Sequence, residues 1–165
     1  AASEMLQHAI GASQRIMMNL RPPILEQGLV AAVRWLASGF ERRTGASTTV
    51  RVANEQMQVT SDVQLVAYRT TQEALTNAAK YASPSKVVID LSDREGVLTL
   101  EIADDGCGMS PEMRTKPKAF GLKGLQERAR TVGGWLDISS QPGKGTCITL
   151  TVPITATAAH QTEEF

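Results

Sequence analysis

The stretch Ala103–Met109 contains two acidic residues and two glycines within seven positions. A carboxylate held at a turn can accept hydrogen bonds from an amino group, and glycine lets another molecule come close to the backbone. The stretch follows alternating apolar residues, Leu98, Leu100 and Ile102, which predict a half-buried strand. Because Asp-Gly pairs are also ordinary turn residues, a plain hairpin turn remains an alternative for this stretch alone.

A second group of polar side chains lies between Thr70 and Tyr81, where the sequence predicts a helix. Glu73 and Asn77 are four residues apart and therefore share one helix face, which Lys80 and Tyr81 continue. An amide oxygen suits Mg²⁺, an ion that keeps several waters and bridges to phosphates. Glu73 could orient a water on such an ion, and Lys80 could meet phosphate charge. A solvated helix surface is the alternative.

Two further stretches contain glycines that could approach phosphate. Gly121 and Gly124 open a helical pattern that includes Lys123, and free N–H groups at a helix N-terminus bind phosphate. Their spacing matches neither the P-loop nor the dinucleotide fingerprint, and a flexible loop before an ordinary helix is the alternative. Gly145 and Thr146 end a tight turn before the last strand, which by itself fits a hairpin.

The elements that must position these residues follow from the spacing of apolar side chains. Helices are expected over 2–20, 24–40 with a stop at Gly45, 63–81 with Ser61-Asp62 as cap, and 121–132; strands are expected over 48–53, 87–91, 98–102, 135–139 and 148–152. Strands and helices do not alternate regularly, which disfavours a doubly wound sheet. The expected fold is therefore α+β, a two-layer sandwich with helices over one face of a mixed sheet, preceded by a helical segment.

Composition narrows the function classes. The chain of 165 residues carries 17 basic and 17 acidic side chains, so its charge gives no case for nucleic acid or an anionic membrane surface. No apolar run approaches the roughly 20 residues of a membrane span. Cys107 and Cys147 show neither metal-ligand spacing nor a disulfide framework, which indicates free thiols in a reducing compartment. With His8 and His160 alone, a histidine-based metal site or a Ser-His-Asp arrangement is disfavoured.

The order and spacing of these stretches resemble the ATP-binding catalytic domain of sensor histidine kinases, in the GHKL superfamily shared with gyrase, Hsp90 and MutL. The residues at 73–77 resemble the N box, and those at 104–108 the first glycine box. The residues at 121–128 resemble the second glycine box in its nitrate-sensor (NarX-like) subfamily form, and 145–146 the last. Leu20-Arg21-Pro22 resembles the end of that subfamily's dimerisation hairpin. The resemblance implies the Bergerat ATP-binding fold.

The resemblance also implies a role for each motif. Asp104 would accept the adenine amino group, while Gly106 and Gly108 would let the chain pass close to the base. Asn77 would ligate Mg²⁺ with Glu73 beside it, and these two are the expected catalytic residues. The full set of expected ATP-binding residues is Asn77, Lys80, Tyr81, Asp104, Gly106, Gly108, Met109, Gly121, Leu122, Lys123, Gly124, Leu125 and Thr146.

The implied activity is transfer of the γ-phosphoryl group of ATP to a histidine on a dimerisation helix, and from there to a response regulator. His8 lacks the acidic neighbour of the family's acceptor box, so it is expected to be an ordinary helical histidine. Residues 1–28 are expected to form the end of the dimerisation hairpin, 29–154 the catalytic domain and 155–165 a flexible tail. Residues 109–120 would form a lid over ATP.

The acceptor helix is expected to be missing from this chain, which then would not phosphorylate itself. The resemblance implies that the full-length parent kinase is a homodimer. It also implies that the catalytic domain lies in the cytoplasm, even if the parent kinase is anchored in a membrane. No nucleic acid and no direct membrane contact is expected for this part.

The sequence leaves three alternative functions open. Another ATPase of the superfamily, such as an Hsp90-like or MutL-like module, is disfavoured by Leu20-Arg21-Pro22. A serine kinase of the anti-sigma type would lack the helical segment. A degenerate nucleotide-binding or interaction module is disfavoured because Asn77, Asp104 and Gly121 are intact. Tyr81 departs from the histidine usual in the nitrate-sensor subfamily, although tyrosine is common there in other histidine kinases.

Overall fold

The structure is a computed structural model that describes residues 20–112 and 121–154. The helix expected over 2–20, which contains His8, lies outside the described residues, as do residues 113–120 of the expected lid and the expected tail at 155–165. Among the described residues, no helix is both long and apolar enough to cross a bilayer.

A five-stranded mixed sheet forms one layer of the fold, as the sequence predicted. Its strands are β1 (Ser47–Val52), β2 (Lys86–Ser92), β3 (Val97–Asp104), β4 (Trp135–Ser140) and β5 (Thr146–Pro153). They lie in the order β1-β2-β3-β5-β4; β1 and β2 are parallel and the other pairs antiparallel. The last of the described strands, β5, is therefore an inner strand of the sheet.

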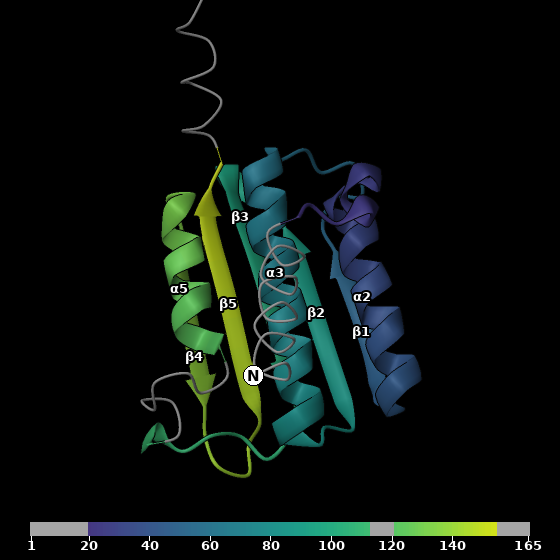
Figure 1. The fold of residues 1–165 in the computed structure, drawn as a ribbon, viewed down its shortest axis with the longest axis vertical. Coiled ribbons are helices and arrows are strands. Elements are labelled where there is room, and N and C mark those ends of the chain that lie inside the picture. Colours follow the sequence, from purple (N-terminus) through teal and green to yellow (C-terminus); the bar gives the residue numbers. More distant parts are fainter. Residues whose placement is uncertain (1–19, 113–120, 155–165) are drawn as a thin grey trace, which may run out of the picture.

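Three helices form the second layer. They are α2 (Leu29–Thr44), α3 (Ser61–Asn77) and α5 (Leu122–Thr131), and all three lie over the same face of the sheet (Figure 1). Because side chains alternate along a strand, every second residue of β2, β3 and β5 points to this layer. The apolar inward residues of these strands, among them Ile89, Leu100 and Leu150, are buried. The two-layer α+β sandwich expected from the sequence is confirmed.

The second expected helix begins later than the apolar spacing suggested. Residues Pro23–Gln27 form a short 3₁₀ turn, and α2 begins at Leu29. Gly28 lies between them with φ of +99°, a conformation that no helix contains. The expected stop at Gly45 is confirmed, because Gly45 closes α2 in the left-handed conformation.

Both ends of α3 differ from the sequence expectation. Thr60, not Ser61-Asp62, caps its N-terminus, since the Thr60 hydroxyl accepts a hydrogen bond from the Val63 N–H. At the other end the helix widens into one π-helical turn, Ala78–Ala82. The chain then leaves the helix at Ser83, which has a positive φ and precedes a proline. Periodicity alone does not distinguish such a turn from a continued α-helix.

Candidate functional site

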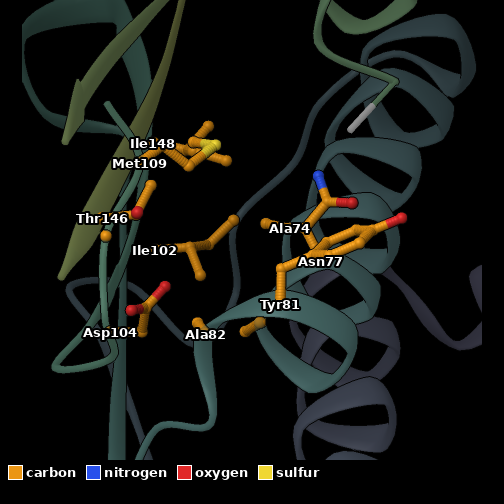
Figure 2. Close-up of a pocket in the computed structure, with 11 residues that line it drawn as sticks. Ala74, Asn77, Tyr81, Ala82, Ile102, Asp104, Met109, Thr146 and Ile148 are labelled. Atoms are coloured by element: carbon orange, nitrogen blue, oxygen red, sulfur yellow. The ribbon is translucent and has the colours of Figure 1, made fainter. Parts of the chain in front are cut away.

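A pocket opens on the helical side of the sheet, between the end of α3 with its π-helical turn and strands β3 and β5 (Figure 2). Its lining residues are Ala74, Asn77, Ala78, Tyr81, Ala82, Ile102, Asp104, Gly108, Met109, Thr146 and Ile148. Six of these belong to the ATP-binding residues expected from the sequence: Asn77, Tyr81, Asp104, Gly108, Met109 and Thr146. Residues far apart in the chain therefore meet at one cavity.

The register of β3 against β5 builds the inner wall of this pocket. Asp104 stands opposite Thr146, and Ile102 stands opposite Ile148. Residues two apart on a strand point to the same face, so the carboxyl and hydroxyl groups lie side by side with the two isoleucines next to them. The wall thus combines apolar side chains with a carboxyl and a hydroxyl group, all of which are drawn in Figure 2.

The Asp104 carboxyl group is held in place by the backbone around it. Its Oδ1 accepts a hydrogen bond from the Gly106 N–H at 2.9 Å, and the Thr146 backbone N–H also donates to it. Burial raises the pKa of Asp104, and these two hydrogen bonds oppose that shift without cancelling it. A desolvated carboxylate of this kind favours a ligand that brings a hydrogen-bond donor.

The neighbouring Asp105 has a different role, which is structural. Its Oδ1 accepts hydrogen bonds from the backbone N–H groups of Ser85 and Lys86, both at 2.9 Å, and Oδ2 accepts one from the Ser85 hydroxyl. The Ser85 hydroxyl contributes most to a lowered pKa of Asp105, followed by the Lys86 N–H. Asp105 is exposed and ties the glycine-rich turn to the beginning of β2, away from the pocket.

The helical wall of the pocket consists of small residues with polar groups at its edge. Ala74, Ala78 and Ala82 line it, and Asn77 and Tyr81 border the opening (Figure 2). Sequence reasoning missed the three alanines, although their spacing of four along the helix was a usable signal. Large side chains at these positions would fill the space that the pocket leaves for a flat ligand.

The glycine-rich turn packs directly on the π-helical turn. A Cβ at Gly106 would come within 2.5 Å of both Cβ and the carbonyl oxygen of Ala82. The Cys107 N–H donates to that carbonyl at 3.0 Å, and the Cys107 thiol donates to the Tyr81 carbonyl at 2.9 Å. The widened helix end and the turn therefore position each other.

A third turn, between β4 and β5, completes this end of the pocket. Ser140 is buried, and its Oγ lies 2.7 Å from the Met109 backbone N, 2.7 Å from Thr146 Oγ1 and 3.2 Å from the Gly145 carbonyl oxygen. A Cβ at Gly108 would lie 2.0 Å from the Gln141 carbonyl oxygen, so glycine is needed at this close approach. The sequence expectations did not include Ser140.

The other expected site residues do not line the pocket. Gly121 approaches Glu73, since a Cβ on Gly121 would lie 2.5 Å from Glu73 Oε1, and α5 thus begins beside the α3 carboxylate. Lys80, Lys123 and Gly124 are exposed. The side chains of Leu122 and Leu125 are buried in the core and hold α5 on the sheet, so the ligand role expected of them is limited to their backbone groups.

Comparison with known proteins identifies the family of this domain. Residues 62–156 match the family described as "Histidine kinase-, DNA gyrase B-, and HSP90-like ATPase", and this segment contains the whole pocket. The chain belongs to this ATPase family. Membership of this family implies that the domain binds ATP.

Curated relatives refine the assignment to histidine kinases. The oxygen sensor histidine kinase NreB of Staphylococcus carnosus is 36% identical over 143 residues, which cover 86% of this chain and 41% of NreB. The signal transduction histidine-protein kinase/phosphatase DegS of Brevibacillus brevis is 29% identical over a segment that covers 92% of this chain and 39% of DegS. The chain is thus the ATP-binding catalytic domain of a two-component sensor histidine kinase, and it spans about two fifths of these relatives.

Solved structures show the same fold. The catalytic domain of histidine kinase ThkA, in a nucleotide-free form, superposes with a TM-score of 0.65 at 16% identity and covers 76% of this chain and 92% of its own. The Acinetobacter baumannii histidine kinase AdeS gives a TM-score of 0.64 at 18% identity over 92% of this chain and 80% of its own. At these identities the likeness concerns the fold.

The donor groups of this histidine kinase domain fit a magnesium ion that is shared with a nucleotide. Within residues 20–112 and 121–154, no three His, Cys, Asp or Glu side chains gather into a metal site. The Asn77 side chain reaches the pocket, and Glu73 lies one helical turn before it. Mg²⁺ commonly takes one or two protein ligands and completes its shell with water and phosphate oxygens, which is the kind of ligand set these two residues offer.

Proposed function

We propose that this domain binds ATP with Mg²⁺ in the pocket and donates the γ-phosphoryl group to a histidine on a dimerisation helix of its parent kinase. A response regulator then takes the phosphoryl group on an aspartate. The observation that carries the proposal is the pocket wall, where Asp104 and Thr146 stand opposite each other in the β3–β5 register and face Asn77 on α3.

Residues in and near the pocket have separate tasks in this proposal. Asp104 accepts the adenine amino group, and Ile102 and Ile148 contact the flat base. Asn77 holds Mg²⁺, which neutralises phosphate charge when it is bound, and Glu73 orients a water in its shell. The exposed Lys80 and Lys123 supply positive charge near the phosphates.

The transfer itself needs positioning more than covalent chemistry from this domain. A neutral imidazole nitrogen of the acceptor attacks the γ-phosphorus, the bond to the β–γ bridging oxygen breaks, and ADP leaves as the imidazole loses its ring proton. Free N–H groups at the beginning of α5, next to Gly121, favour phosphate binding at this side of the pocket.

Asn77 tests the magnesium part of the proposal. Replacing it with alanine should reduce the ATP affinity measured with Mg²⁺ by about tenfold, because the ion loses a protein ligand. Affinity measured in EDTA should stay near the wild-type value, since the base contacts of Asp104 remain. Isothermal titration of both proteins under both conditions measures the effect. If Mg²⁺ raises the ATP affinity of Asn77→Ala as much as that of the wild type, Asn77 is not a ligand of the ion.

Labelling with γ-³²P ATP tests the phosphoryl transfer. We expect label on a histidine when the dimerisation hairpin of the parent kinase is supplied as a separate polypeptide, and no label on His8 of this chain. The motivation is that His8 lacks an acidic neighbour. Phosphohistidine mapping distinguishes the two sites, and label on His8 would overturn this part of the proposal.

The proposal extends to the domain boundaries, the subfamily and the oligomeric state of the parent kinase. We propose that residues 1–28 are the end of the dimerisation hairpin, 29–154 the catalytic domain and 155–165 a tail, and that the full-length kinase is a homodimer. The Leu20-Arg21-Pro22 motif supports placement in the nitrate-sensor subfamily. Residues 109–120 are proposed to close over bound ATP.

A further inference from the structure

A groove lies between helices α3 and α5, which pack against each other side by side (Figure 1). It is lined by residues of the first half of α3 and by residues of the end of α5 with Val132 after it, and none of them lines the pocket beside Asp104. The groove has a volume of about 370 Å³, which lies within the range of small-molecule sites. Its size therefore fits one small molecule.

The floor of this groove is apolar. Val66 is buried, and Leu65 and Val132 are half-buried beside it. Because the last two side chains are in part accessible to water, an apolar group placed on them would remove apolar surface from water. The floor thus favours a ligand that has an apolar portion.

Two guanidinium groups border the floor, one from each helix. Arg69 and Arg128 are both half-buried. Burial lowers the pKa of Arg69 most, and the positive charge of Arg128 lowers it further. Within residues 20–112 and 121–154, the Arg128 guanidinium has neither an ion pair nor a hydrogen-bond acceptor. An anion between the two side chains would replace their repulsion by attraction to both.

The Arg69 side chain is fixed in place before any ligand arrives. Its Nη1 donates to Gln72 Oε1 at 2.8 Å, its Nη2 donates to the Leu20 carbonyl oxygen at 3.2 Å, and its guanidinium carbon lies 5.7 Å from the centroid of the Tyr68 ring. A fixed side chain loses little conformational freedom on binding. Asp62, the carboxylate among the lining residues, lies two helical turns before Arg69, about 10 Å along the helix axis. The groove therefore has a distinct positive end.

We propose that the groove between α3 and α5 is a binding site for a small amphipathic anion, a carboxylate or phosphate group joined to an apolar chain. The anionic group lies between Arg69 and Arg128, and the apolar chain lies on Leu65 and Val132. Arginine suits this task because its planar fork matches the oxygens of both anionic groups. The site shares no lining residue with the nucleotide pocket, so the inference does not depend on the proposed function.

Titration of the full chain with octanoate and with octyl phosphate tests the site. Both should cause saturable NMR shifts of the methyl groups of Leu65, Val66 and Val132, with dissociation constants of about 1–10 mM, the range expected for ligands of about ten non-hydrogen atoms. The ratio of the two constants shows which anionic group is preferred. Octanol, the uncharged control, should bind about tenfold more weakly, because it lacks the charge that the arginines attract.

Substitutions locate the anionic group. Arg128→Gln should weaken both anions by about 10-fold or more, as expected for loss of a charged hydrogen bond. Arg130→Gln is the matched control, since Arg130 is an exposed arginine on the same helix that does not line the groove, and it should keep wild-type affinity. Thr131→Glu places a carboxylate at the exposed edge of the groove, should also weaken both anions, and replaces Arg128→Gln if that variant does not fold. Thermal unfolding verifies that each variant is folded.

Several results would overturn the inference. Octanol binding as tightly as the anions would mean that only the apolar floor acts. Equal losses in Arg128→Gln and Arg130→Gln would indicate general attraction to the positive surface. Shifts of the Ile102 and Ile148 methyl groups that ATP reverses would place the anions in the nucleotide pocket instead. Absence of saturable shifts with both anions also excludes the site.

Discussion

Asp104→Asn should weaken ATP binding by about 10- to 100-fold, because a hydrogen bond to a charged acceptor contributes about 1.5–3 kcal/mol. The variant keeps the shape of the side chain but loses its charge, and its amide can turn a donor toward the adenine amino group. Calorimetric or fluorescence titration with ATP measures the change. Unaltered affinity would show that Asp104 does not recognise the base.

The same substitution should leave the protein without nucleotide at least as stable as the wild type at neutral pH. Burial raises the pKa of Asp104 in the folded state, so folding disfavours its ionised form. The folded protein consequently holds the Asp104 proton more tightly than the unfolded chain. The loss of folding stability caused by the ionised carboxylate is fully present above the folded pKa. The stability difference between Asp104→Asn and wild type should shrink as pH falls through that pKa toward the ordinary value of 3.8.

Asp105→Asn is the matched control, since it makes the same chemical change one residue away. Hydrogen bonds from Ser85 and Lys86 lower the pKa of Asp105, so its charge favours folding above its ordinary pKa, and this contribution disappears as pH falls through the lower folded value. The control should lose some thermal stability at neutral pH and keep wild-type ATP affinity. Equal losses of affinity in both variants would mean that the whole turn, and not Asp104, is being tested.

Gly145→Ala should be strongly damaging, although it adds only one methyl group near the pocket. Gly145 has φ of +83°, and an added Cβ would lie 2.0 Å from the Asp104 carbonyl oxygen, far inside any normal contact. Left-handed conformation costs an alanine about 1 kcal/mol, and overpacking typically adds about 1–3 kcal/mol. We therefore expect a loss of about 3 kcal/mol in the free energy of unfolding, measured in urea, together with loss of ATP binding as β3 and β5 move apart.

Gly143→Ala is the control that separates backbone strain from the steric clash expected in Gly145→Ala. Gly143 lies two residues earlier in the same turn with a φ of +78°, and nothing lies within 4 Å of the Cβ it would gain. Only the conformational cost of about 1 kcal/mol should remain, and ATP affinity should be near that of wild type. If the two variants lose equal stability, close packing of Gly145 against β3 is not what matters.

Sequence reasoning was most reliable where one local pattern decides the structure. The alternation of Leu98, Leu100 and Ile102 predicted β3, and Gly45 predicted the end of α2; both are confirmed. Each depends on a side-chain period or a backbone preference that acts within a few residues. Likewise, six expected ligand residues line one pocket because their motifs stand at the ends of correctly predicted elements.

Features that depend on distant partners could not be predicted in this way. The π-helical turn at Ala78–Ala82 is in contact with Gly106, from another part of the chain. The hydrogen bonds of Ser140 depend on β5 pairing with both β3 and β4, an order that no periodicity reveals. The hydrogen bonds of Asp105 could not be predicted for the same reason, since its partners precede it by about twenty residues.

The inner position of β5 also has a consequence for how the domain is made. Ribosomes build the chain from its N-terminus, and β5 (Thr146–Pro153) is the last of the five sheet strands described that they deliver, although it lies between β3 and β4. Until it emerges, Asp104 has no Thr146 opposite it, and Ile102 has no Ile148. Nascent chains that stop in the loop before β5 therefore carry every upstream motif and still lack half of the pocket wall, so nucleotide capture begins only when this strand has been translated and inserted.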